Sequence, residues 1–250
     1  LAVLNKSNIK INEIIITEAD VHKAILNLKN TKSRGHDDIS TTTIKRNVSI
    51  FVPILAALFQ ESLKQGIFPN KMKKAQIIPI FKKGDKKHIE NYRPISILST
   101  ISKIFEACVK EKIINYLDQI KFFAQNQFGF LKQKSTDLAI FSKITDLIDS
   151  IEKNNAAVTL YLDLAKAFDT VDHKRLIVKL EEIGFSGSLL SWFESYLHER
   201  PHTVKLNGKE SNSLITKYGV PQGSVLGPIL FNIYINDLFN LPIKGRAYGF

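Results

Sequence analysis

The chain has 250 residues and a mass of 28.3 kDa, with 44% hydrophobic and 24% charged residues, close to the averages of globular domains. This composition excludes disorder, collagen and coiled coil as descriptions of the whole, and no apolar run approaches the roughly 18 residues of a membrane-spanning helix. A single cysteine, Cys108, excludes an internal disulfide framework and a cysteine-rich zinc site, as in proteins of a reducing compartment. The chain begins at Leu1 without a signal-peptide pattern, so we expect it to be part of a longer protein.

The net charge of +11 arises almost wholly before residue 156. It is densest between residues 71 and 87, where seven lysines stand against one acid, Asp85. A local basic excess favours a polyanion partner, because each phosphate contact releases condensed counterions. A lysine-rich surface kept in solution by its charge is the alternative.

In the first half of the chain, short amphipathic segments predict helices. Thr17 can cap a helix whose apolar face continues to residue 28, and a helix over roughly 53–65 would have Pro53 in its first turn and end at Gly66. Residues 76–81 predict a strand, which Pro79 places at a sheet edge. A further helix carries Ile101, Phe105, Cys108 and Leu117 on one face.

In the second half, an amphipathic helix from Thr136 precedes residues 158–163, whose alternation predicts a strand ending at Asp163. Helices follow over about 172–183 and from Ser188. Asn207-Gly208 predicts a hairpin turn, and an apolar helix follows Pro221. Helices and strands mix without strict alternation, which favours an α+β fold.

Three segments have residue types suited to chemistry. Asp163 at a strand end suits a hard cation such as Mg²⁺, although a cap of the following turn is the simpler interpretation of this residue alone, and Asp169 and Asp172 are better placed as helix N-caps. In the loop after Gly219, Gln222 and Gly223 could lie beside a nucleotide, although a tight structural turn is the alternative.

A lysine and an arginine form the third candidate. Lys82 at a strand end and Arg93 about ten residues later could grip a triphosphate, Lys82 as a point charge and Arg93 through two hydrogen bonds. A solvated basic loop is the simpler interpretation.

Taken in order, these segments resemble the reverse transcriptase domain of non-LTR (LINE-type) retrotransposons, most of all the insect jockey group. The resemblance rests on residues 35–39 (GHDDI), 91–96 (NYRPIS), 127–130 (QFGF), 135–136 (ST), 162–169 (LDLAKAFD) and 219–224 (GVPQGS). Reverse transcriptases of group II introns or retrons share the Asp163 and Gln222 motifs, but the amino-acid sequence around Arg93 favours the LINE type.

The resemblance implies the fingers and partial palm of a right-hand polymerase. Residues 1–30 would form an N-terminal extension, 31–155 the basic fingers and 156–250 a truncated palm without a thumb. It also implies an RNA template, a DNA primer and deoxynucleoside triphosphates as partners, and no membrane. Asp163, helped by the Leu164 carbonyl, would ligate two Mg²⁺ ions for nucleotidyl transfer.

The remaining roles follow from the same resemblance. Phe168 would exclude a 2′-hydroxyl, Gln222 and Gly223 would line the nucleotide pocket, and Lys82 and Arg93 would reach the triphosphate. The family's next motif, an Ala-Asp-Asp pair, does not occur before Phe250. We therefore expect a fragment that is inactive alone, with a decayed or domesticated nucleic-acid-binding remnant as the alternative. Asp38 departs from the glycine that relatives often have.

Overall fold

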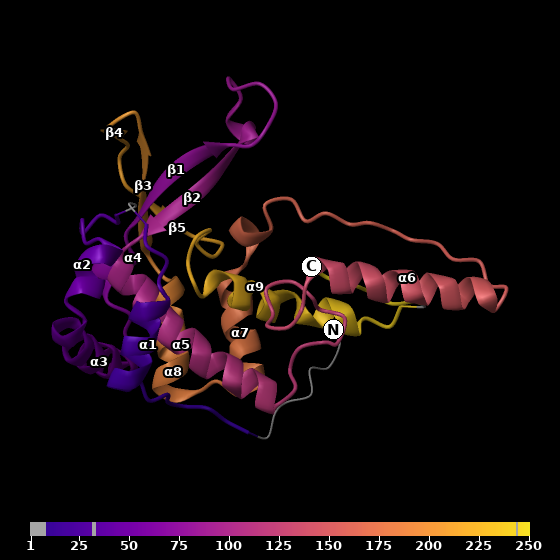
Figure 1. Cartoon of the computed structure of the whole chain (residues 1–250), viewed down its shortest axis with the longest axis horizontal. Helices are drawn as coiled ribbons and strands as arrows, with labels where there is room; N and C mark the ends of the chain where they lie inside the picture. The colour runs from indigo at the N-terminus through magenta and orange to yellow at the C-terminus, as the bar shows by residue number, and fades with distance from the viewer. Residues whose placement is uncertain (1–8, 32–33, 244) are drawn as a thin grey trace.

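The computed structural model describes residues 9–31, 34–243 and 245–250. Most helices gather with a small sheet into one body, from which helix α6 extends as an arm (Figure 1). The helices are α1 (Glu18–Asn27), α2 (Thr41–Arg46), α3 (Val48–Gln65), α4 (Asn70–Lys73), α5 (Thr100–Gln119), α6 (Thr136–Glu152), α7 (His173–Ile183), α8 (Gly187–Leu197) and α9 (Gly227–Ile235). The short 3-10 helices are η1 (Ile89–Asn91), η2 (Ala167–Thr170) and η3 (Asn236–Asn240), and the strands are β1 (Ala75–Phe81), β2 (Tyr92–Leu98), β3 (Arg200–Leu206), β4 (Lys209–Glu210) and β5 (Leu214–Thr216).

An aromatic cluster lies at the centre of the body. Phe59 of α3 stacks on Phe105 of α5 with ring centroids 4.2 Å apart, and Phe68 meets Trp192 of α8 edge to face at 5.3 Å. All four side chains are fully buried. Because large aromatic side chains remove much apolar area from water, this cluster fixes α3, α5 and α8 against one another.

Helix ends mostly follow the predicted signals. The Thr17 hydroxyl accepts from the Asp20 amide, and the Asp20 carboxylate accepts from the Thr17 amide, which confirms the cap of α1. Gly66 and Gly184 end α3 and α7 in the left-handed conformation. The predicted start of α3 was wrong, because the helix begins before Pro53. Pro53 therefore lies in the second turn of α3, where it lacks the amide hydrogen that would bond the carbonyl four residues earlier and its ring crowds that carbonyl.

The sheet has the order β2-β1-β3-β4, with β5 also paired to β3. Strand β1 runs antiparallel to β2 along its whole length and parallel to β3 over residues 75–77. The prediction that this strand lies at an edge was therefore wrong for its first half. Pro79 lies beyond the last residue paired with β3, so its missing N–H breaks no bond on that side. The mixed open sheet among helices confirms the α+β class.

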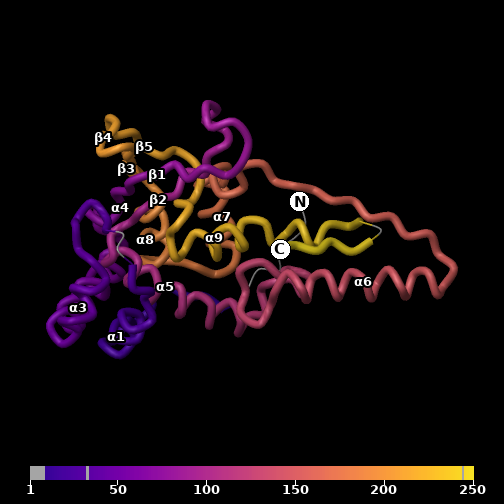
Figure 2. Tube along the Cα trace, turned by 45° about the horizontal axis from the view of Figure 1, so that its top comes forward, coloured from indigo at the N-terminus to yellow at the C-terminus, as the bar shows by residue number. Residues whose placement is uncertain are grey.

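The arm formed by α6 keeps its predicted apolar face, but that face is exposed: Phe141 is 70% and Ile144 49% accessible. The connecting segment (residues 153–166) runs back beside the arm as an extended chain, as both views show (Figures 1 and 2). The predicted strand at residues 158–163 does not form, and Val158 is 94% exposed. Alternation predicts a strand with one buried face, but a strand also needs a neighbour to pair with, and none of the described strands pairs with this segment.

No helix in the described part of the chain has the length and apolarity needed to cross a membrane.

Candidate active site

The glycine loop (residues 219–227) closes onto η2 through backbone hydrogen bonds. The Gly219 amide donates to the Val171 carbonyl at 2.7 Å, and the Val220 amide donates to the Phe168 carbonyl at 2.8 Å. Gly219 has a φ of +85°, and a Cβ there would lie 2.8 Å from the Phe168 oxygen. Another backbone therefore approaches Gly219 too closely for a larger residue to fit.

The same loop also binds strand β2. The Ser96 amide donates to the Gln222 carbonyl at 2.8 Å. Gly223 follows with a φ of +116°, and a Cβ there would lie 2.6 Å from the Ser96 oxygen. The neighbour that approaches Gly223 is thus strand β2, and its predicted place beside a nucleotide stays a prediction.

The side chain of Gln222 reaches back to η2. Its amide nitrogen donates to the two Asp169 carboxylate oxygens at 3.1 and 3.2 Å. The predicted capping role of Asp172 is confirmed, since its carboxylate accepts from the Arg175 amide at 2.8 Å. The capping role predicted for Asp169 was wrong, because Asp169 lies within η2 and binds Gln222 instead.

Phe168 lies at the meeting point of three motif segments. Its ring stacks on Phe231 of α9, with centroids 4.9 Å apart, and meets Phe130 edge to face at 5.8 Å. The aromatic contact brings the 127–130 motif to Phe168, whose carbonyl the glycine loop also binds. Motifs separated by about 90 residues along the chain therefore form one surface.

Two asparagines one turn apart hold the loop before α6, and the sequence analysis missed both. Asn232 accepts from the Gln127 amide group at 3.1 Å and donates to the Gly129 carbonyl at 2.7 Å. Asn236 donates to the Phe122 carbonyl and accepts from the Ala124 amide. Both asparagines are 1% exposed, and polar residues at i and i+4 inside the apolar α9 pattern were the available signal.

Lys82 and Arg93 lie at the tip of the β1–β2 pair. Arg93 pairs in register with Ile80, and the Lys82 amide donates to the Asn91 carbonyl at 2.8 Å. Both side chains are exposed, and neither forms an ion pair with an acid among the described residues. They are thus available to an anion, Arg93 on the strand that the glycine loop touches at Ser96 and Lys82 just after the neighbouring strand β1.

Asp163 and Leu164 are not brought to this surface by any described contact. Both lie exposed on the connecting segment, where a contact of the Lys143 amine with the Tyr161 ring and hydroxyl tethers the chain to α6. Carboxylate and carbonyl oxygens suit Mg²⁺, but the described residues contain no group of three or more His, Cys, Asp or Glu able to hold a metal. One carboxylate does not fit the two-ion site that the resemblance implies.

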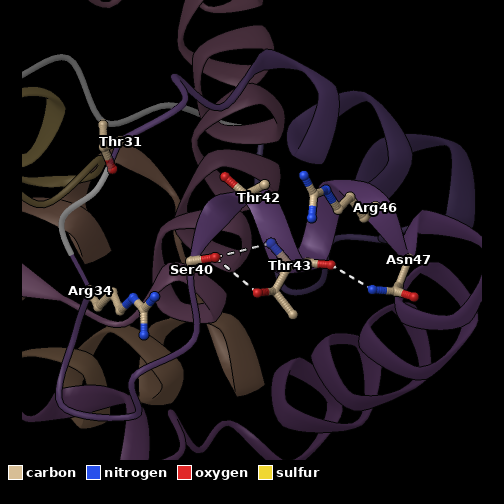
Figure 3. Close-up of a pocket in the computed structure, with 7 residues that line it drawn as sticks. All are labelled: Thr31, Arg34, Ser40, Thr42, Thr43, Arg46 and Asn47. Atoms are coloured by element: carbon tan, nitrogen blue, oxygen red, sulfur yellow. Dashed lines mark hydrogen bonds between the residues drawn. The ribbon is translucent and has the colours of Figure 1, made fainter.

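A pocket of about 580 Å³ lies elsewhere, beside α2 (Figure 3). Ser40 caps α2 by accepting from the Thr43 amide at 3.0 Å, and Arg34 and Arg46 add positive charge to the lining. None of the residues predicted to bind nucleotide or metal lines it. Nearby, Asp38 has a φ of +54°, the left-handed conformation that a glycine adopts most readily.

Residues 80–247 match the family model described as reverse transcriptase (RNA-dependent DNA polymerase). The chain belongs to the reverse transcriptase family. The match includes η2, the glycine loop, Lys82 and Arg93, so the surface described above lies wholly within the family region.

Proteins of insect mobile elements resemble this reverse transcriptase chain over most of its length. The RNA-directed DNA polymerase from mobile element jockey of Drosophila melanogaster is 32% identical over 89% of the chain, and that of Drosophila funebris is 30% identical over 94%. The probable RNA-directed DNA polymerase from transposon BS of Drosophila melanogaster is 30% identical over 88%. These matches confirm the predicted resemblance to the jockey group. The chain spans only about a quarter of each relative, 24%, 26% and 24% respectively.

Proposed function

We propose that this chain is the fingers and part of the palm of an RNA-directed DNA polymerase that copies retrotransposon RNA into DNA. The observation that carries the proposal is the closure of the glycine loop on η2, with Gln222 bound to Asp169 and Phe168 packed beside them. The family match and the relatives, which are named as RNA-directed DNA polymerases, support it. Residues 1–30, 31–155 and 156–250 then correspond to the N-terminal extension, fingers and palm.

In this proposal the surface at the glycine loop receives a deoxynucleoside triphosphate. Gln222 and Gly223 line the base and sugar side, and Phe168 sits beneath the sugar, where its ring would meet a 2′-hydroxyl. Lys82 and Arg93 approach the triphosphate from the β1–β2 tip, where their exposure and lack of an acidic partner support the role.

Mg²⁺ is the proposed metal, with Asp163 supplying a carboxylate and Leu164 a carbonyl oxygen. The bound ions would stabilise charge on the phosphates during nucleotidyl transfer. Because a single carboxylate does not complete this site, the 250-residue chain is proposed to be inactive by itself. Its own residues then bind and orient the nucleotide, and further carboxylates have to join Asp163.

The RNA template and DNA primer are the proposed macromolecular partners. The exposed turn between β1 and β2 contains four lysines and two acids. The lysines are Lys82, Lys83, Lys86 and Lys87, and the acids are Asp85 and Glu90. Binding through such lysines weakens steeply with salt, because the released counterions are taken up again when the complex dissociates.

A remnant that binds nucleic acid without catalysis is the second candidate, favoured by the exposed position of Asp163. The test is RNA-templated primer extension by an extended protein that contains the residues encoded after Phe250. Extension by the parent and its loss in Asp163→Asn, with RNA affinity retained, supports the polymerase. RNA binding without extension by the parent supports the remnant, and equal extension by both proteins removes Asp163 from the metal site.

A further inference from the structure

A buried carboxyl group lies directly behind the glycine loop. Glu106 of α5 is fully buried, and its Oε2 accepts from the Val225 amide at 2.7 Å and from the Leu226 amide at 3.1 Å. Its Oε1 accepts from the Ser102 hydroxyl at 3.1 Å, one turn earlier in the same helix. These three hydrogen bonds join α5 either to itself or to the glycine loop.

The start of α9 has no side-chain N-cap. Leu226 occupies the N-cap position and has no side-chain acceptor, and the first helical residues are Gly227 and Pro228. Ser224 accepts only from the Gly227 amide, at 2.9 Å. An unpaired buried amide costs roughly 1–3 kcal/mol, so Glu106 stabilises the two amides just before α9, those of Val225 and of the N-cap residue Leu226.

The place of Glu106 relative to β2 gives this contact a function. Strand β2 ends at Leu98 and α5 begins at Thr100, so Ser96 and Glu106 belong to consecutive elements. Ser96 binds the loop at Gln222, and Glu106 binds it three residues later. The turn at Gln222 and Gly223 is therefore held on both sides by the β2–α5 unit, which also carries Arg93.

We propose that Glu106 is a positioning residue of the nucleotide surface. Its carboxyl group holds the glycine loop so that Gln222 and Gly223 keep a fixed distance from strand β2, which carries Arg93. The inference rests on the proposed function, because it assigns the turn to nucleotide binding. The role depends on the length of the Glu106 side chain rather than on its charge, since both loop contacts are to uncharged backbone amides. Burial first, and Glu106 second, raise the pKa of the nearby Tyr196 hydroxyl, as expected for a group that is shielded from water.

Two conservative substitutions separate reach from charge. Glu106→Gln keeps the length of the side chain and an oxygen acceptor, whereas Glu106→Asp keeps the carboxyl group but shortens the side chain by one methylene. In the 250-residue chain, hydrogen exchange at Val225 and Leu226 should become about tenfold faster in Glu106→Asp and stay near the parent rate in Glu106→Gln. Exchange at Val109, buried on the same helix, serves as the internal control.

The consequence for the nucleotide is measured in the extended protein. The KM for the complementary deoxynucleotide should rise about tenfold in Glu106→Asp and remain near the parent value in Glu106→Gln and in Ser102→Ala, which removes only the contact within α5. The inference would be overturned if hydrogen exchange at Val225 and Leu226 were unchanged in Glu106→Asp, or if Glu106→Gln had the larger effect. An unchanged KM in an active Glu106→Asp enzyme would overturn it as well. If the parent is inactive but Val225 and Leu226 exchange faster in Glu106→Asp, the proposed function is contradicted, whereas the contact of Glu106 with the glycine loop is established.

Discussion

The amide nitrogen of Gln222 lies 3.1 and 3.2 Å from the two carboxylate oxygens of Asp169, two residues separated by 53 positions in the chain. This contact joins the two motifs that carry most of the resemblance to reverse transcriptases. It occupies the Asp169 carboxylate with a neutral donor. Asp169 thus orients Gln222, while Asp163, six residues earlier, stays exposed.

Removing the Asp169 carboxylate should release Gln222 without unfolding the protein. Because the pair is exposed, Asp169→Ala should change the free energy of unfolding by less than about 1 kcal/mol. The side-chain amide resonances of Gln222 should nevertheless shift in the NMR spectrum. Asp172→Ala is the matched control: it should cost about 1 kcal/mol as a lost N-cap and leave the Gln222 signals in place.

The close approach at Gly223 predicts a large loss of stability on adding a methyl group. Gly223→Ala should lower the free energy of unfolding by about 2 kcal/mol or more, since a positive φ and a clash with the Ser96 oxygen act together. Gly208→Ala provides the control, because Gly208 has a φ of +78° and no atom within 4 Å of the added Cβ. Equal losses in the two variants, measured by urea unfolding, would contradict the contact with Ser96.

The exposed face of α6 should contribute little to stability in this chain. Phe141→Ala should change the free energy of unfolding by less than about 0.5 kcal/mol, because the ring is 70% exposed. Phe105→Ala removes a fully buried ring of the central cluster and should cost about 3–5 kcal/mol. A comparable loss in both variants would show that the α6 face is covered in solution.

Cys108 predicts a pH dependence of stability. Burial raises the pKa of this thiol from 9.0 to about 12 in the folded chain. The folded state therefore retains the proton that the unfolded state loses, so this contribution is complete below pH 9 and is lost as the pH rises from 9 to about 12. Cys108→Ala should flatten that part of the profile, measured by urea unfolding at each pH, and an unchanged slope would contradict the burial of the thiol.

Much of the fold could be predicted because local signals determine it. Thr17, Gly66 and Gly184 mark helix ends through their own backbone and side-chain chemistry, and these ends are where the sequence places them. The meeting of Phe168 with the glycine loop could be expected only from the order of the motifs. No single segment predicts it.

The features that were missed depend on distant partners. The alternation of residues 158–163 predicts a strand but says nothing about which strand would pair with it. Glu106 and Asn232 look in the sequence like ordinary polar residues of helices, yet each is buried against a backbone loop about 100 residues away. Pro79 likewise predicts an edge, and only the register with β3 reveals that the pairing stops just before it.

The most direct test of the account is single-nucleotide incorporation on an RNA template by the extended protein. The ratio of deoxynucleotide to ribonucleotide incorporation is compared between the parent and Phe168→Ala. We expect the parent to prefer the complementary deoxynucleotide strongly and Phe168→Ala to accept the ribonucleotide as well, because the Phe168 ring no longer meets the 2′-hydroxyl. The same ratio in both proteins, or no incorporation by the parent, would contradict the assignment of this surface to the nucleotide.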